Sequence, residues 1–117
     1  SMTPTIIFKE EKPYLVFGSP GGSRIITTVL QVALNVMTHQ MNVAQAVNSP
    51  RIHHQWLPEV LMIEDGFGAD TKALLKDKGY RLYPSRTMGS VQAIMMEDGY
   101  FYGAADPRRP SAGAVSP

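Results

Sequence analysis

The chain has 117 residues, of which 44% are apolar, and its formal net charge at pH 7 is +1. This size and apolar content are typical of one globular domain and not of a disordered chain. The charges are interspersed, so neither nucleic acid nor an anionic membrane is indicated as a partner. The chain has no cysteine, which excludes disulfides, cysteine zinc sites and thiol catalysis. No run approaches about 20 apolar residues, so no membrane span is predicted.

The first predicted elements are two strands, at 5–8 and 13–17, separated by a polar turn. Both strands are apolar on successive residues, a pattern that favours a sheet covered on both faces. Their spacing predicts a hairpin.

The stretch that follows, Phe17-Gly18-Ser19-Pro20-Gly21-Gly22-Ser23-Arg24, predicts a sharp turn from strand to helix. Glycine tolerates the positive φ angles that such a turn needs, and Pro20 stiffens it. A long helical pattern runs from Ile25 to Met41, with its polar side chains in one narrow stripe. A helix that is apolar around most of its circumference is buried on more than one side. It therefore needs a covering layer beyond one small sheet.

The remaining elements are short. Asn42 is predicted to cap a helix over 43–47. The sequence then predicts an extended segment at 51–58, a strand at 60–63, a helix at 71–78 capped by Asp70, and a strand at 81–83 ended by Pro84. A hairpin is expected from 91–96 and 100–102. A loose tail is expected at 109–117. This order predicts an α+β domain with helices on a mainly antiparallel sheet.

Two bare N–H groups, those of Gly21 and Gly22, stand where the main helix begins. The positive end of a helix favours negative charge, so the turn could bind a phosphate, a carboxylate or a developing oxyanion. The chain lacks the Gly-Lys-Ser/Thr ending of a phosphate-binding loop and the third glycine of a dinucleotide fingerprint. On the pattern alone, a purely structural turn is the favoured interpretation.

Four separated motifs resemble the C-terminal subunit of gamma-glutamyltranspeptidases, the glutathione hydrolases. They are GSPGGSRIITTVLQ from Gly18, Ser1-Met2 with Pro4-Thr5, RIHHQWLP from Arg51, and GAADPR from Gly103. They stand in the family's order and cover most of residues 1–108. The resemblance implies that residues 1–108 are the C-terminal portion of the small subunit. The fold it implies is part of an αββα sandwich of the N-terminal-nucleophile hydrolase type.

The resemblance also implies roles for particular residues. Gly21 and Gly22 match the glycines whose N–H groups bind the tetrahedral oxyanion. Ser1 matches the second serine of a Ser-Ser-Met motif that holds the α-carboxylate of the γ-glutamyl group. The family's nucleophile is the N-terminal threonine of the small subunit, upstream of this motif, so the threonines here are internal and not catalytic. We therefore expect this fragment alone to be inactive.

Other polar residues receive structural interpretations. His53 and His54 are adjacent and lack the convergent spacing of metal ligands, so no metal site is predicted. The segment 51–56 is interpreted as a polar and aromatic seam between layers. Asp106-Pro107-Arg108 is interpreted as a turn with a local ion pair. Eight carboxylates are interpreted as solvated charge: Glu10, Glu11, Glu59, Glu64, Asp65, Asp77, Glu97 and Asp98.

The resemblance implies no cofactor. It implies as partners the large subunit and the N-terminal part of the small subunit, with glutathione or other γ-glutamyl compounds as donors. The acceptors would be water, amino acids or dipeptides, in a periplasmic or secreted location after zymogen autoprocessing. Two alternatives stay open, which are a non-catalytic anion-binding module and a structural or interaction domain.

Overall fold

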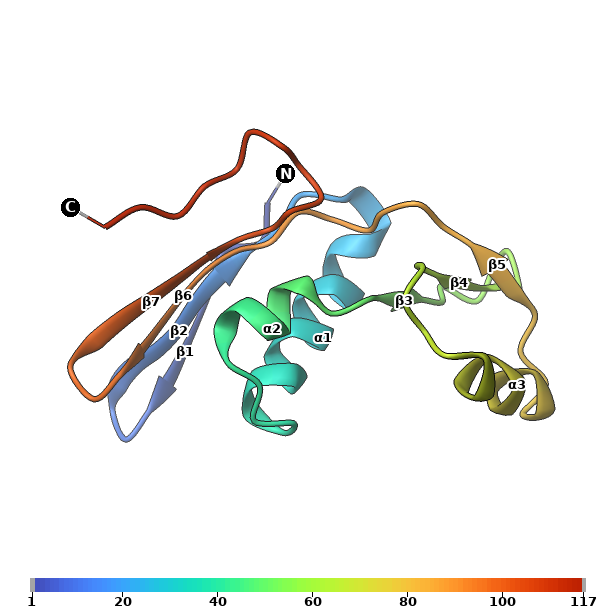
Figure 1. Ribbon diagram of the computed structural model, residues 1–117, viewed down its shortest axis with the longest axis horizontal. Coiled ribbons are helices and arrows are strands. Elements are labelled where there is room, and N and C mark those ends of the chain that lie inside the picture. Colours follow the sequence, from blue (N-terminus) through green and yellow to red (C-terminus); the bar gives the residue numbers. More distant parts are fainter. Residues whose placement is uncertain (1, 117) are drawn as a thin grey trace.

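A computed structural model describes residues 2–116, which form an elongated molecule of 45 × 28 × 23 Å. Its larger sheet is antiparallel throughout, with the strand order β1-β2-β6-β7 (Figure 1). The strands are β1 (Thr5–Lys9), β2 (Lys12–Gly18), β6 (Gln92–Glu97) and β7 (Tyr100–Ala105). Both hairpins predicted from the sequence are therefore confirmed, and the two pair with each other through β2 and β6.

Two helices, α1 (Ile25–Met37) and α2 (Val43–Asn48), cover one face of this sheet. Residues on alternate positions of β2 and β6 face them, so the sheet contributes one side of the core and the helices the other. The core comprises Leu15, Phe17, Val32, Val36, Val43, Ala46, Val47, Val91, Ala93, Met95 and Ala104. The predicted cap of α2 is present, because Asn42 and Gln45 form a reciprocal capping box.

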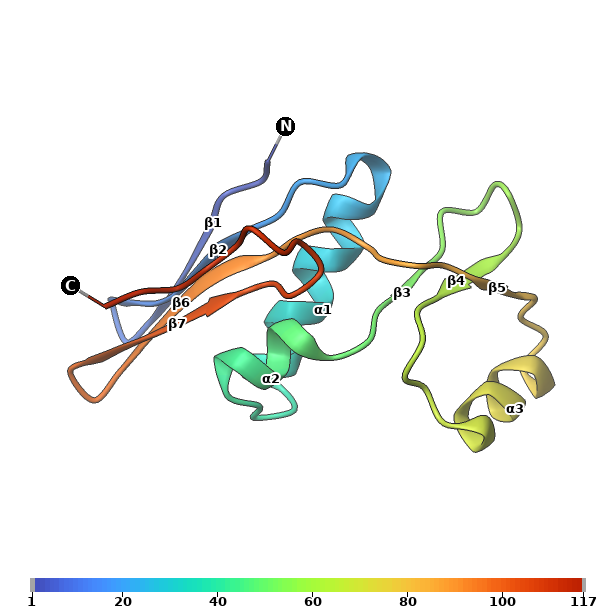
Figure 2. The same ribbon diagram turned by 45° about the horizontal axis from the view of Figure 1, so that its top comes forward.

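A smaller part lies beyond α1 and α2 and contains the sheet β3-β4-β5 with the helix α3 (Figure 2). Its elements are β3 (Ile52–His53), β4 (Leu61–Ile63), α3 (Ala69–Asp77) and β5 (Leu82–Pro84). β3 and β4 are antiparallel, whereas β4 and β5 are parallel and joined through α3. The chain is α+β with mainly antiparallel sheets, as expected.

Several element boundaries differ from the sequence prediction. The helix that begins at Ile25 ends at Met37 and not at Met41. Asp70 lies inside the first turn of α3, whose cap is Gly68, so the predicted cap at Asp70 is wrong. Pro84 pairs in β5 instead of ending the strand before it. Proline is tolerated there because β5 is an edge strand, where a missing N–H costs no ladder bond.

The second face of the larger sheet is open, contrary to the expectation of cover on both faces. Exposed apolar side chains on it include Ile6, Phe8, Ile94 and Phe101, with 56%, 61%, 46% and 77% of their surface accessible. The segment after β7 turns back along the sheet (Figure 2), and Ala114 lies beside Gly103. The rest of the face has no covering layer among residues 2–116.

A second apolar surface follows α1, where Ile26, Leu30, Leu34 and Met37 are all exposed. Their spacing of three or four residues places them on one side of the helix. No helix among the described residues is long and apolar enough to cross a bilayer.

We expect the isolated chain to self-associate, because contiguous apolar surfaces of this kind are buried in stable proteins. Analytical ultracentrifugation over a concentration series, with a hydrophobic dye as a second probe, measures this. Replacing both Leu30 and Leu34 with glutamine should weaken the association. A chain that stays monomeric at high concentration and binds no dye would contradict the expectation.

Candidate active site

The Gly21–Gly22 turn connects the end of β2 to α1 through a short 3-10 helix at Gly22–Arg24. Gly21 has φ +148° and Gly22 has φ +59°, a region that side-chain-bearing residues rarely occupy. The N–H of Arg24 donates to the carbonyl of Gly21 at 3.1 Å. Two consecutive positive φ angles thus require the glycine pair.

The N–H groups of this turn are free. Neither the Gly21 nor the Gly22 N–H donates a hydrogen bond to any other residue within 2–116. Both glycines are exposed, and a Cβ built on Gly22 would meet nothing within 4 Å. Two unpaired donors therefore lie in an exposed turn at the start of a helix, an arrangement that can stabilise a bound or developing negative charge.

The turn is supported from behind by Ser19 and by Gly89, which precedes β6. Ser19 is fully buried, and its Oγ accepts from the N–H of Ser90 at 2.9 Å and donates to the carbonyl of Pro20 at 2.7 Å. Gly89 has φ +71°, and a Cβ there would lie 2.6 Å from Ser19 Oγ and 2.9 Å from Thr28 Cγ2. Only glycine fits this position, which no local pattern in the sequence marks.

Next to this support lies a buried cluster of two arginines and two carboxylates. Arg51 binds Asp106 at 2.8 Å, and Arg108 binds both Asp106 at 3.1 Å and Glu64 at 2.5 Å. Arg51 and Asp106 are 1% and 0% exposed, and Glu64 is 4% exposed. The interpretation of Glu64 as a solvated charge is therefore wrong. The ion pair expected within Asp106–Arg108 is confirmed, as one part of this larger cluster.

The cluster holds backbone groups from four segments. Arg51 donates to the carbonyls of Met88 at 2.6 Å and Val47 at 2.8 Å, and Glu64 accepts the N–H of Met88 at 2.6 Å. Arg108 donates to the carbonyls of Val47 in α2 and of Ser49 just after it, and Asp106 accepts the N–H of Val91, which precedes β6. Because Met88 is held at both its N–H and its carbonyl, the adjoining Gly89 is fixed beneath the turn.

Burial affects the titration of these groups unequally. It lowers the pKa of the Arg51 guanidinium, and the nearby Asp106 carboxylate only partly restores it. Burial also opposes ionisation of Asp106, but the N–H groups of Val91 and Arg108, with the charge of Arg51, outweigh it and hold its pKa below the usual 3.8. The pKa of Arg108 is raised, because its bonds to Glu64 and Asp106 outweigh its burial.

We expect the Asp106 interactions to contribute stability that is present above pH 3.8 and lost as the pH falls through the lower folded-state pKa. Urea unfolding at a series of pH values below about 5 measures this loss. Asp106→Asn should lower the stability at neutral pH and flatten its fall in acid. Asp77→Asn, at an exposed carboxylate, is the control. If the free energy of unfolding of Asp106→Asn falls as steeply with decreasing pH as that of the original chain, Asp106 is not the cause of the loss in acid.

The other predicted residues fall in several places. Ser1 lies outside the described residues. His53 is 3% exposed whereas His54 is exposed, so the two neighbours differ in their surroundings. Residues 2–116 contain no group of three or more histidine or acidic side chains placed to hold a metal ion.

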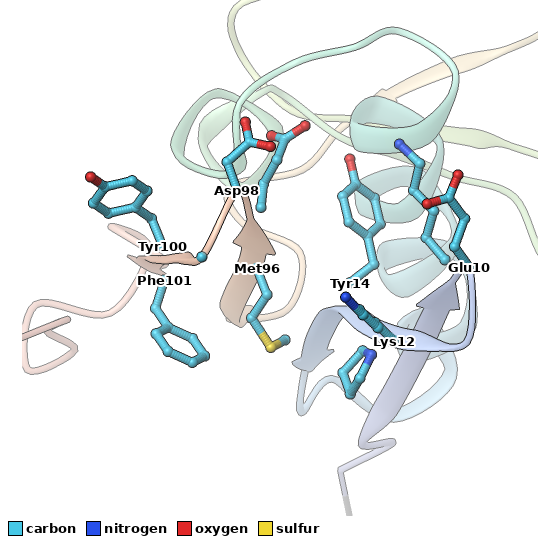
Figure 3. A pocket seen from close by; sticks show the side chains of 11 residues that line it. Glu10, Lys12, Tyr14, Met96, Asp98, Tyr100 and Phe101 are labelled. Atoms are coloured by element: carbon cyan, nitrogen blue, oxygen red, sulfur yellow. The ribbon is translucent and has the colours of Figure 1, made fainter.

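A hollow lies away from the turn, between the tips of the β1–β2 and β6–β7 hairpins (Figure 3). Tyr14 and Lys12 line one side, and Met96, Asp98 and Phe101 line the other. It sits at the start of β2, about 20 Å along that strand from the turn. Its lysines and carboxylates do not converge on a common point, so we assign it no chemistry.

Comparison with known proteins identifies the family. The model of the gamma-glutamyltranspeptidase family matches residues 1–116. The glutathione hydrolase proenzyme of Escherichia coli K12 is 56% identical over 109 residues, covering 92% of this chain and 19% of that protein. The corresponding proenzyme of Bacillus subtilis 168 is 41% identical over 115 residues, covering 96% of this chain and 19% of that protein.

Solved structures agree. The Helicobacter pylori gamma-glutamyltranspeptidase T380A mutant superposes with a TM-score of 0.88 at 52% identity, covering 93% of this chain and 61% of that chain. The Pseudomonas nitroreducens gamma-glutamyltranspeptidase complexed with L-DON gives a TM-score of 0.88 at 35% identity, and the match covers 100% of this chain and 63% of that chain. This chain thus spans about a fifth of the length of the curated relatives.

These structures confirm the expected fold class, since the described sheet and its helix layer correspond to part of the N-terminal-nucleophile hydrolase fold. The glycine turn, the seam from Arg51 and the Asp106–Arg108 turn all lie within the matched region. The chain belongs to the gamma-glutamyltranspeptidase family.

Proposed function

We propose that residues 1–108 form the C-terminal portion of the small subunit of a gamma-glutamyltranspeptidase, and that Gly21 and Gly22 form its oxyanion hole. The observation that carries the proposal is the pair of free N–H groups on a turn whose backbone is fixed from behind by Ser19 and Gly89. Donors held in place before the reaction stabilise charge that develops in the transition state without reorganising.

In this proposal the reaction begins with a threonine that lies outside this chain. Its hydroxyl oxygen attacks the γ-carbonyl carbon of a γ-glutamyl amide such as glutathione, and the carbonyl oxygen becomes an oxyanion bound by Gly21 and Gly22. The intermediate collapses by expelling the amine, which takes up a proton, and leaves a γ-glutamyl ester on the enzyme. Water, an amino acid or a dipeptide then accepts the γ-glutamyl group.

Ser1 has a binding role in this account. We propose that its hydroxyl donates to the α-carboxylate of the γ-glutamyl group, as the family motif implies. The large subunit and the N-terminal part of the small subunit complete the site and cover the open face of the larger sheet. From the family resemblance, we propose that the assembled enzyme is periplasmic or extracellular.

We expect this chain alone to hydrolyse no γ-glutamyl amide, because its threonines are internal and cannot supply an N-terminal nucleophile. An assay with a γ-glutamyl anilide at high protein concentration tests this, with the full-length parent enzyme as the positive control. Turnover by the chain that disappears in Ser1→Ala would overturn the proposal and make Ser1 a nucleophile.

A second candidate function is that of a non-catalytic anion-binding module, which the same exposed donors favour. It predicts that phosphate or a simple carboxylate saturates the turn. Titration of the chain followed by the amide NMR signals of Gly21 and Gly22 distinguishes the two. Saturable binding at low millimolar concentration, together with a full-length protein that cleaves no γ-glutamyl anilide, would favour the module.

A further inference from the structure

The glycine pair is flexible in itself, so its orientation has to be set by neighbouring residues. A serine stands on each side of Pro20-Gly21-Gly22. On the upstream side Ser19 is held by the N–H of Ser90. On the downstream side Ser23 reaches a different part of the molecule, the segment that follows β3.

The Ser23 Oγ donates to Oε1 of Gln55 at 3.0 Å. The same oxygen lies 2.9 Å from Nε2 of His53, and the other ring nitrogen, Nδ1, lies 2.7 Å from Oγ1 of Thr27 on α1. An amide oxygen only accepts, so both Ser23 and His53 donate to it. A neutral His53 therefore carries its proton on Nε2, and its Nδ1 accepts from the Thr27 hydroxyl, which also lies 3.2 Å from the carbonyl oxygen of Arg24.

This chain of contacts is anchored at both ends. His53 is 3% exposed, and Gln55 fixes its own amide by donating through Nε2 to the carbonyl of Leu57 at 2.9 Å. The side-chain amide of Gln31 on α1 donates to the carbonyl of Ile52 at 2.7 Å and accepts its N–H at 2.9 Å. The strand that carries His53 is thus fixed to the first turns of the helix that the glycine turn opens.

We propose that Gln55 and His53 are positioning residues for the oxyanion hole, and that they hold the N–H of Gly22 through Ser23. This inference rests on the proposed function. Neither side chain touches the reacting atoms in this account. Gln55 fixes Ser23, the residue next to Gly22, and His53 fixes Gln55 against α1.

The test uses the full-length parent enzyme and measures the rate of acylation by a γ-glutamyl anilide in single turnovers. Gln55→Ala should slow acylation about tenfold, the effect of losing one well-placed hydrogen bond, while the apparent substrate affinity changes by less than about twofold. Gln55→Glu keeps an accepting oxygen for Ser23 and His53 but loses the donor to the Leu57 carbonyl, so it should recover only part of the lost rate. Failure of this rescue would count against the proposal.

Ser23→Ala should reproduce the loss, and the double variant with Gln55→Ala should be no slower than either single variant, because both remove the same contact. The matched control is Gln45→Ala, which removes another glutamine that makes side-chain bonds, in the capping box of α2. It should lower the melting temperature and leave the acylation rate unchanged. If the losses in Ser23→Ala and Gln55→Ala multiply in the double variant, the two residues act separately and the inference is wrong.

Comparison with Gly22→Ala distinguishes the positioning role of Gln55 and Ser23 from the oxyanion role of the glycine turn. Slow acylation in Gly22→Ala with a normal rate in Gln55→Ala and Ser23→Ala would overturn the positioning role alone. Normal rates in all three variants would overturn the oxyanion role of the turn as well. Ser23→Ala removes only an exposed hydroxyl, so it keeps the test decisive if Gln55→Ala fails to fold.

Discussion

Replacing Gly22 with alanine in the full-length enzyme is expected to slow acylation about 100-fold or more, the effect of displacing one oxyanion-hole donor. Gly22 has φ +59°, and its added methyl group would enter the open space in front of the turn. That space is where the tetrahedral centre would form. The expected loss is therefore in the chemical step, measured as the single-turnover acylation rate with a γ-glutamyl anilide.

Gly99→Ala is a matched control for the backbone strain of this change. Gly99 has φ +79° in the β6–β7 hairpin, and a Cβ there also meets nothing within 4 Å. Gly99→Ala should lower the free energy of unfolding about as much as Gly22→Ala does, and it should leave the acylation rate unaltered. Ser1→Ala should instead weaken the apparent affinity, because the substrate carboxylate is bound both before and during the reaction. A folded Gly22→Ala enzyme with near-normal acylation would reduce the glycine pair to a structural turn.

Arg51→Ala is expected to destabilise the fold by about 3–5 kcal/mol, as removal of one partner from a buried ion pair typically does. The change leaves the buried carboxylate of Asp106 without its strongest counter-charge and leaves two buried carbonyls, of Val47 and Met88, without this donor. Domains of this size are stable by about 5–15 kcal/mol. The free energy of unfolding, measured by urea denaturation, should therefore fall by a large fraction.

Two further variants test whether the loss of stability in Arg51→Ala comes from the buried ion-pair cluster. Arg51→Lys keeps the charge but cannot reach three partners with a planar fork, so it should recover only part of the loss. Arg86→Ala, at an exposed arginine, should change the stability by no more than about 0.5 kcal/mol. An Arg51→Ala chain within about 1 kcal/mol of the original would show that the cluster is not a major source of stability.

Local signals in the sequence were sufficient for much of the fold. The β6–β7 hairpin followed from apolar strands on both sides of Asp98-Gly99, and the cap of α2 followed from Asn42. Boundaries were less accurate where two signals competed. Asp70 is a good helix cap in isolation, but Gly68 is the extended residue that precedes the helix, which begins at Ala69.

The features that hold the glycine turn could not be predicted in the same way. Glu64 follows a short strand and precedes Asp65-Gly66, which is a pattern typical of an exposed turn. Its burial depends on Arg108, which is 44 residues away in sequence. Gly89 has no local signal either, since its need for glycine comes from Ser19 and Thr28. The oxyanion role itself was inferred from the family resemblance and not from the pattern.

The most direct test of the central claim is a crystal structure of the full-length enzyme with a tetrahedral γ-glutamyl boronate bound to its nucleophilic threonine. The distances to be measured run from the boronate oxygen that occupies the oxyanion position to the backbone nitrogens of Gly21 and Gly22. The account predicts that both fall at about 2.7–3.1 Å. An oxygen that is bound by other donors, with both glycine nitrogens beyond hydrogen-bonding distance, would contradict it.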